Sequence, residues 1–391
     1  MNQSKKKEQV GLLRRLFGQM GFLPQRMVVD ETEAYYAASQ WQLMGRKFRK
    51  HKLARVAMVV LGLLYLQALF GQFIAPQGLT TYSSSFVNCG PTPIRIVDDS
   101  GRLRAPFVYG ITTERDPVTM RKHYTEDKSK IYPIQFFAKG EPYRFLGLFE
   151  TDRHLFGVGE GGRIFLYGTD GGGRDLFSRI VLGSQVSLSL PLVGLSISFV
   201  LGLLIGSISG YFGGIVDSII QRLIEVLMSF PTLPLWMALS AAIPPRVPML
   251  QMYLLITMIL SLLSWTGLAR TVRGKFMSLR EEDYVMAARL AGVSDRKIIL
   301  THLIPGFMSY LIVSMTMSVP SMIIGETSMS FLGLGLRSPV TSWGVLLKEA
   351  QEIQNVALYS WKLIPLVYVI ITVISFNFFG DGLRDAADPY T

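Results

Sequence analysis

The chain has 391 residues, of which 49% are hydrophobic and only 17% are charged. Soluble domains carry roughly 25% charged residues, so this composition excludes most soluble enzymes. The 39 lysines and arginines outnumber the 28 acidic residues, which suits an inner-membrane protein whose cytoplasmic segments collect positive charge. A nucleic-acid-binding protein would carry this charge on a polar fold, so we expect no nucleic-acid partner.

Six apolar stretches are long enough to cross a bilayer, which takes about 20 residues. They cover approximately 56–75, 184–209, 219–243, 251–268, 307–324 and 363–379. The polar first 55 residues show no signal-peptide pattern, so we expect the first span to remain as a membrane anchor. The predicted fold is therefore an all-α polytopic membrane protein with about six transmembrane helices.

Basic residues orient the spans. They crowd the residues before the first span and recur in the loop 269–306. The positive-inside rule then places both termini and this loop in the cytoplasm, and 77–183 outside. Just before the first span, Trp41, Met44 and Phe48 share one helical face. This spacing predicts an amphipathic helix at the cytoplasmic interface, with a solvated basic tail as the alternative.

The external segment shows strand patterns. The runs 94–97 and 103–109 flank a turn sequence and predict a hairpin. A second hairpin is predicted from 131–137 and 143–149, and the polar stretch 113–130 is predicted to be a loop. We therefore expect a small β-rich extracytoplasmic insert.

The domain boundaries follow from these segments. They are a cytoplasmic segment with an interfacial helix at 1–55, a first transmembrane helix at 56–76, an insert at 77–165, and a membrane core at 166–391 that contains five spans and the loop 273–305.

Catalytic, cofactor and metal motifs are not found in the sequence. Cys89 is the single cysteine, so an intrachain disulfide is excluded, and the four histidines lack metal-ligand spacing. The sequence has no P-loop to hold ATP. A G-x-G-x-x-G run at 157–162 follows no convincing strand and precedes no helix, so we interpret its glycines as turn residues.

The loop 269–306 carries the most specific pattern. Residues 282–291 favour a helix, and Gly292 can take the left-handed conformation that ends one. Ser294 is placed to cap a second helix with Asp295 in its first turn, and Pro305 precedes the fifth span.

Small and apolar residues suggest that this loop docks into a groove of a partner rather than serving as a solvated connector. Ala287 and Ala288 permit close backbone approach. The expected apolar face consists of Val285, Leu290, Ile298 and Ile299.

The same residues resemble a family signature. Ala287-Ala288, Gly292 and Ile304-Pro305 resemble the "EAA" signature of bacterial ABC-importer permeases, with Met286 where that signature has Glu. In that family the loop forms a coupling helix that inserts into a cleft of the ATP-hydrolysing subunit. The resemblance therefore implies that the residues docking the ATPase subunit are Ala287, Ala288, Gly292, Ser294, Asp295 and Pro305.

Three further segments resemble the dipeptide/oligopeptide/nickel permeases. They are the run 167–179, the S-F-L-G-L-G and S-W-G residues at 330–335 and 342–344, and the G-D-x-L-R-D ending at 380–389. The basic stretch before the first span and the C-terminal ending look most like the C-type permease, which pairs with a B-type permease. The resemblance covers the chain from about residue 40, except for about 80–160.

This resemblance implies a non-enzymatic permease of the type I ABC importer kind in the bacterial inner membrane. The chain would form half of the pathway for peptides or a related small solute, with nickel and oligosaccharide as alternatives. The implied partners are a second, B-type permease, two ATPase subunits that carry ATP and Mg, and an external solute-binding protein. No cofactor is expected in this chain itself.

Alternatives rest on other residues. Arg222 and Glu225 lie three residues apart in the third span and form either a structural pair or part of an ion-coupled secondary transporter that uses Glu225. Asp170 with Arg174-Asp175 suggests a turn with an ion pair rather than acid/base catalysis. A third alternative is a membrane-anchored binding or sensory protein that acts through 80–160.

Overall fold

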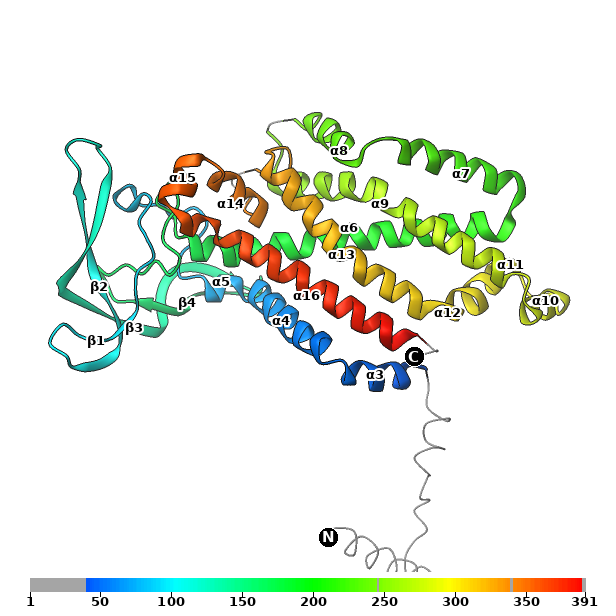
Figure 1. The fold of residues 1–391 in the computed structure, drawn as a ribbon, viewed down its shortest axis with the longest axis horizontal. Coiled ribbons are helices and arrows are strands. Elements are labelled where there is room, and N and C mark those ends of the chain that lie inside the picture. The colour runs from blue at the N-terminus through cyan, green and yellow to red at the C-terminus, as the bar shows by residue number, and fades with distance from the viewer. Residues whose placement is uncertain (1–39, 245, 338–339, 389–391) are drawn as a thin grey trace, which may run out of the picture.

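The computed structural model describes residues 40–244, 246–337 and 340–388. Within these ranges, five helical segments are long and apolar enough to span a membrane, and a bent helix pair makes a sixth candidate. Figure 1 shows them side by side in one bundle. The five are α4 (Lys52–Leu69), α6 (Leu176–Phe212), α9 (Met249–Leu279), α13 (Met308–Phe331), and α16 (Ile364–Ala387) with the preceding 3-10 turn η3 (Ser360–Leu363).

The third predicted span is broken rather than continuous. It consists of α7 (Gly214–Ser229) and α8 (Thr232–Ala241), which bend by 83° at the break. Pro231 explains the break, because a residue before proline avoids the helical region. Phe230 accordingly has extended backbone angles, with φ −82° and ψ 132°.

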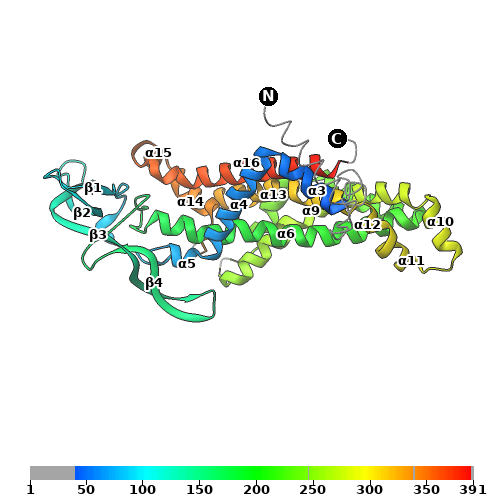
Figure 2. The same cartoon turned by 90° about the horizontal axis from the view of Figure 1, so that it is seen from below.

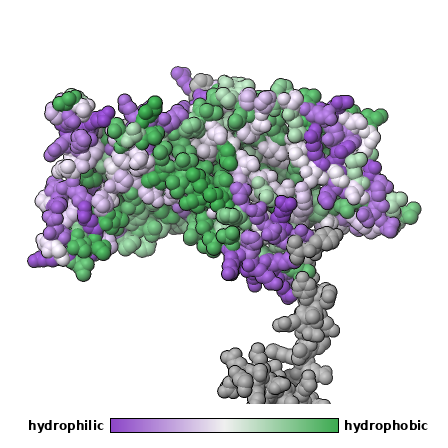
Figure 3. Space-filling model, viewed as in Figure 1, coloured by the Kyte–Doolittle hydropathy of each residue, from purple (hydrophilic) through white to green (hydrophobic). Residues whose placement is uncertain are grey.

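Short helices connect and flank the spans. These are α3 (Gln40–Lys50), α5 (Gly71–Ile74), η1 (Ser84–Phe86), α10 (Asp283–Leu290), α11 (Asp295–Lys297), the π-helical turn η2 (Ile298–Leu303), α12 (Ile304–Gly306), α14 (Trp343–Ala350) and α15 (Ile353–Leu358). Figure 1 places α10 and α11 at one end of the bundle and the β-strands at the other. Hydrophobic residues gather on the face between these polar ends (Figure 3).

The insert forms a four-stranded antiparallel sheet in the order β1-β2-β3-β4. The strands are β1 (Arg95–Val97), β2 (Leu103–Arg115), β3 (Lys122–Phe145) and β4 (Phe149–Val158). The first predicted hairpin is confirmed as β1 and β2. Figure 2 shows β4 beside α5, and Phe70, just before α5, stacks on Phe145 at the end of β3 with ring centroids 6.0 Å apart.

The second predicted hairpin is wrong, and so is the predicted loop at 113–130. The first predicted strand and the start of the second, up to Phe145, lie in the 24-residue strand β3, and the chain reverses only at 146–148. The Gly140-Glu141-Pro142 run, which favours a turn, instead lies at a shift of register between Lys139 and Tyr143. The sequence suggested a turn because glycine and proline favour turns. The strand continues here because a bulge tolerates proline inside a strand.

Glycines of α6 allow α9 to pack closely against it. A Cβ atom on Gly206 would lie 2.5 Å from the carbonyl oxygen of Ala269, and one on Gly210 would lie 2.6 Å from that of Arg273. Gly202 faces Trp265 and Leu268 in the same way. This four-residue spacing of small residues is a common contact between membrane helices, so these glycines serve in helix packing.

Residues 40–50 form the predicted helix α3. Met44 is buried, and the ring of Phe48 packs edge-on against Phe379 of α16 at 5.6 Å. The alternative of a solvated tail is therefore excluded for this stretch. The side chain of Trp41 lies outside the described residues.

We expect Gly206→Ala to lower the free energy of unfolding by about 1–3 kcal/mol, because a methyl group would press on the backbone of α9. Gly267→Ala is the matched control, since a Cβ atom there meets nothing within 4 Å. Thermal unfolding in detergent, followed by tryptophan fluorescence, measures both variants. Equal melting temperatures would contradict the close contact between the two helices.

Candidate coupling site and buried ion-pair network

The turn after α10 has the predicted left-handed geometry. Gly292 has φ +75°. Its N–H donates to the carbonyl of Arg289 at 2.9 Å, and the N–H of Val293 donates to the carbonyl of Ala288 at 3.1 Å. These two bonds are the Schellman pattern of helix termination. A side chain at Gly292 would be strained even though the space around it is open.

The second short helix begins where predicted, but a different contact holds it. Ser294 occupies the N-cap position and its side chain makes no capping hydrogen bond. The hydroxyl of Tyr211, near the end of α6, instead donates to Asp295 at 2.5 Å. The guanidinium of Arg289 lies over the Tyr211 ring, 5.0 Å from its centroid. Tyr211 therefore links both sides of the turn to α6, a role that the sequence did not reveal.

The predicted apolar face is divided between two surfaces. Val285 and Ile298 are fully buried, and Ile299 is half-buried against the same cluster, which includes Phe276 of α9. Leu290 points away and is 89% exposed. The prediction of one docking face was therefore wrong for three of its four residues, because they attach the segment to the bundle.

A smaller outward surface remains for docking. We call it the α10 tip and define it by Tyr284, Met286, Ala287 and Leu290, all of which are exposed. The remaining predicted docking residues are Ala288, which is half-buried, and Gly292, Ser294, Asp295 and Pro305, which are exposed.

An ion pair ties α7 to α9 near the same end of the bundle. The guanidinium of Arg273 contacts both carboxylate oxygens of Asp217, at 2.5 and 2.6 Å. This bidentate geometry is the stronger form of such a pair. Arg280 donates to the carbonyl of Gly210 at 3.2 Å and so attaches the end of α9 to α6.

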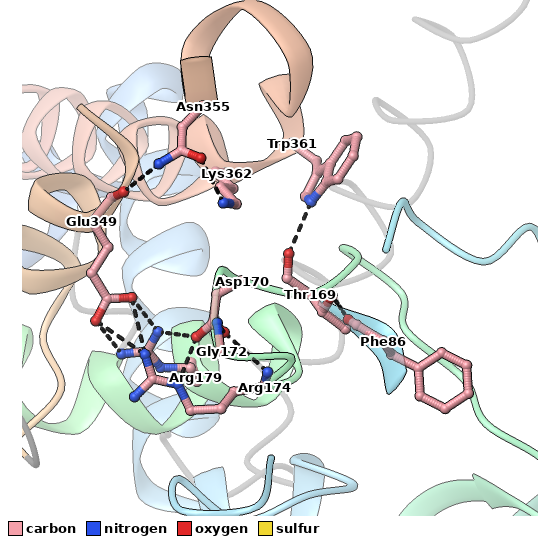
Figure 4. A network of polar contacts seen from close by, with 10 residues as sticks. All are labelled: Phe86, Thr169, Asp170, Gly172, Arg174, Arg179, Glu349, Asn355, Trp361 and Lys362. Atoms are coloured by element: carbon pink, nitrogen blue, oxygen red, sulfur yellow. Dashed lines mark hydrogen bonds and ion pairs between the residues drawn. The ribbon is translucent and has the colours of Figure 1, made fainter. Parts of the chain in front are cut away.

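The opposite end of α6 carries a buried ion-pair network (Figure 4). Arg179 is 1% exposed and pairs with both Asp170 and Glu349, the latter at 2.5 Å. Arg174 pairs with Asp170 at 2.7 Å. Although burial opposes ionisation, the charge of Arg179 and the backbone N–H of Arg174 hold the pKa of Asp170 below its ordinary value. The predicted turn with an ion pair is confirmed.

Asp175 does not take part in this pairing. Its carboxylate caps α6 by accepting from the backbone N–H of Ser178 at 2.9 Å. Burial raises the pKa of Asp175 to about 6, despite the hydrogen bonds from Ser178.

A pocket of about 590 Å³ lies beside the network, lined in part by Arg174, Glu349 and Lys362. Lys362 is almost completely buried and donates to the side-chain oxygen of Asn355 at 2.8 Å. Asn355 in turn donates to the backbone carbonyl of Glu349 at 2.9 Å. The network therefore joins the start of α6 to α14, α15 and η3.

Glu326 of α13 is a second buried carboxylate that the sequence analysis missed. It is 0% exposed and accepts from the hydroxyls of Ser330 and Ser342, both at 2.8 Å. It thereby joins the S-F-L-G-L-G and S-W-G segments. A carboxylate at the end of an apolar stretch was the available signal.

Two weaker motifs have structural roles. Arg222 and Glu225 form a pair at 2.9 Å on an exposed face of α7, as the structural interpretation predicted. The 157–162 glycine run begins at the end of β4, so the prediction that it follows no strand was wrong. It leads into a turn in which the N–H of Gly162 donates to the carbonyl of Gly159, and it precedes no helix.

Two protein-family profiles match this chain. The profile for binding-protein-dependent transport system inner membrane components matches residues 202–391, and that for the N-terminal transmembrane domain of oligopeptide transport permease C matches 39–91. The class is therefore a membrane-spanning transport permease.

Individual relatives give the same class. The oligopeptide permease OppC of Haemophilus influenzae is 40% identical over 57% of this chain and 70% of its own length. The dipeptide permease DppC of Lactococcus lactis is 31% identical over 92% of this chain and 94% of its own. Among solved structures, one chain of the inward-facing MetNI methionine ABC transporter aligns over 95% of its own length with 53% of this chain, at 19% identity and a TM-score of 0.43.

The chain belongs to the binding-protein-dependent transport system inner membrane components, and within them to the C-type peptide ABC permeases. It is an integral inner-membrane protein and a transport subunit.

We expect Glu349→Gln to reduce the free energy of unfolding by about 2 kcal/mol, because the buried guanidinium of Arg179 would lose a charged partner. Glu352→Gln is the matched control, since Glu352 lines the same pocket but is exposed and forms no ion pair with a described residue. Thermal unfolding in detergent separates the two variants. If both melt alike, the network does not hold α6 to α14.

Proposed function

We propose that this permease carries peptides or a closely related small solute inward, as one half of the translocation pathway of an ATP-driven importer. Its relatives are peptide permeases, and the chain shares their family. The exposed α10 tip is the observation that carries the coupling proposal, because Tyr284, Met286 and Leu290 are exposed together on one short helix, and a group of apolar side chains favours a partner surface where a single one does not.

The proposed partners follow from this arrangement. A second, B-type permease would complete the pathway, and two ATPase subunits would hold ATP and Mg and perform the hydrolysis. An external solute-binding protein would deliver the solute. The chain would contribute no cofactor and no catalytic residue. The end with α3 and α10 would face the cytoplasm together with both termini, and the sheet would face outward, as the basic residues before α4 favour.

Coupling would proceed through α6. The α10 tip, with Gly292, Ser294, Asp295 and Pro305 beside it, would sit in a cleft of an ATPase subunit. Its movement would reach α6 through Tyr211, which contacts Asp295 and Arg289. A helix of this length extends about 55 Å, and its other end is held by the Arg179 network. The two ends of the pathway would therefore be mechanically joined.

Uptake by the reconstituted complex tests the proposal. Proteoliposomes with the binding protein outside should accumulate a labelled peptide when ATP is enclosed, and a proton uncoupler should not stop them. An ion-coupled transporter using Glu225 would show the reverse pattern. Uptake of a nickel complex or an oligosaccharide, with none of the peptide, would contradict the proposed substrate class.

We expect Leu290→Lys to lower ATP-driven uptake at least tenfold, because a charge would enter the apolar contact with the ATPase subunit. Val118→Lys is a matched control, since Val118 on the β2–β3 turn is 88% exposed and Leu290 is 89% exposed. The measurement is initial uptake per assembled complex. Equal uptake by the two variants would argue against docking at the α10 tip.

A further inference from the structure

A groove lies where α3 crosses the C-terminal end of α16. Its volume is about 780 Å³. Figure 1 shows the two helices side by side at this end of the bundle, and Figure 3 shows a hydrophilic area there next to the hydrophobic face. We call it the α3 groove and define it by Leu43, Arg46, Arg49, Lys50, Gly382 and Ala386.

The walls of the groove are held in place by contacts on both sides of the elbow between α3 and α4. Met44 is buried next to Ser309, whose hydroxyl lies 3.4 Å from the methionine sulfur. His51 caps α4 by accepting from the N–H of Ala54 at 3.1 Å, and its other ring nitrogen lies 3.7 Å from Asp385 of α16. Gly382 permits this close crossing, because a Cβ atom there would lie 2.2 Å from that of Ala54.

The groove concentrates positive charge, because four cationic side chains line it, from Arg46, Lys47, Arg49 and Lys50, against one carboxylate, from Asp385. Arg46, Arg49 and Lys50 are exposed, and within the described part of the chain none of the three forms an ion pair. Arg46 and Lys50 are four residues apart and therefore project from the same face of α3. Lys47, on the same face, donates to the backbone carbonyl of Asp388 at 2.7 Å.

Apolar surface adjoins these charges directly. Leu43 and Ala386 are half-buried or buried in the lining, and Leu53 and Val56 of α4 are exposed just beyond the elbow. Since α4 begins at Lys52, the groove lies at the boundary where a membrane span starts. A site with cations at its rim and an apolar wall next to a span matches a lipid with an anionic headgroup.

We propose that the α3 groove binds an anionic phospholipid, with the phosphodiester among Arg46, Arg49 and Lys50 and an acyl chain along α4. Arginine presents several donors to phosphate oxygens, and lysine adds a point charge. The positive-inside rule explains the number of cations but not their convergence on one groove, because that rule depends only on charge count near the span.

Native mass spectrometry of the full complex in mild detergent tests this site. Phosphatidylglycerol and phosphatidylcholine with identical acyl chains are added at equal concentration. We expect retained phosphatidylglycerol to fall at least fivefold in the R46Q/R49Q/K50Q variant, and phosphatidylcholine to stay low in both proteins. Inorganic phosphate at the same concentration should not displace the lipid, because the acyl chain contributes to binding.

Two controls make the result specific. R102Q/R115Q/K139Q removes the same charge from exposed positions of the external sheet and should retain phosphatidylglycerol as the parent does. R46K/R49K keeps the charge and should retain most of the binding.

Equal retention of phosphatidylglycerol by the parent and R46Q/R49Q/K50Q would overturn the proposal, and so would equal retention of the two lipids by the parent. If the triple variant does not assemble, R46Q and K50Q are measured singly. Each should lower retention at least twofold, and unchanged retention in both would likewise refute the site.

Discussion

The buried guanidinium of Arg179 is the constraint on which the half of the permease next to the β-sheet depends. A charge that is 1% exposed is stable only with opposite charges beside it, and Asp170 and Glu349 supply them. Asp170 comes from the turn before α6, and Glu349 comes from α14. The pairing therefore fixes the position of α6 relative to the short helices α14 and α15.

Helix α6 also organises the opposite end of the bundle. Close packing of its glycines on α9 makes α6 and α9 a single unit. Tyr211 attaches the turn around Gly292 to that unit. Val285 and Ile298 pack the inner side of the α10–η2 segment against the bundle. If this segment docks as proposed, its firm attachment would pass a displacement to the spans.

The sequence predicted the features that depend on local chemistry. The apolar lengths located five spans, and glycine at residue 292 predicted the left-handed turn, because few other residues adopt that conformation. The family resemblance identified the class of permease. Proline also carried local information: Pro231 marks a break in the third predicted span, and Pro142 lies at a bulge in β3 rather than in the predicted hairpin turn.

Features that depend on tertiary contacts could not be predicted in this way. Arg179 and Glu349 are 170 residues apart, so neither reveals the other in the sequence. Leu290 and Val285 are both apolar and helical, and only the position of α9 determines that one is buried and the other exposed. The Tyr211 contact with Asp295 has the same cause, since it joins two segments 84 residues apart.

The central claim is that the α10 tip transmits motion from an ATPase subunit. Site-specific cross-linking tests this claim most directly. The native Cys89 is buried. A cysteine introduced at an exposed position would therefore be the thiol that the cross-linker reaches among the described residues. In the assembled importer, a short thiol-to-amine cross-linker should join Leu290→Cys to an ATPase subunit and should leave Val118→Cys unjoined. A Leu290→Cys protein that assembles and transports, yet never cross-links to the ATPase subunit, would contradict the account.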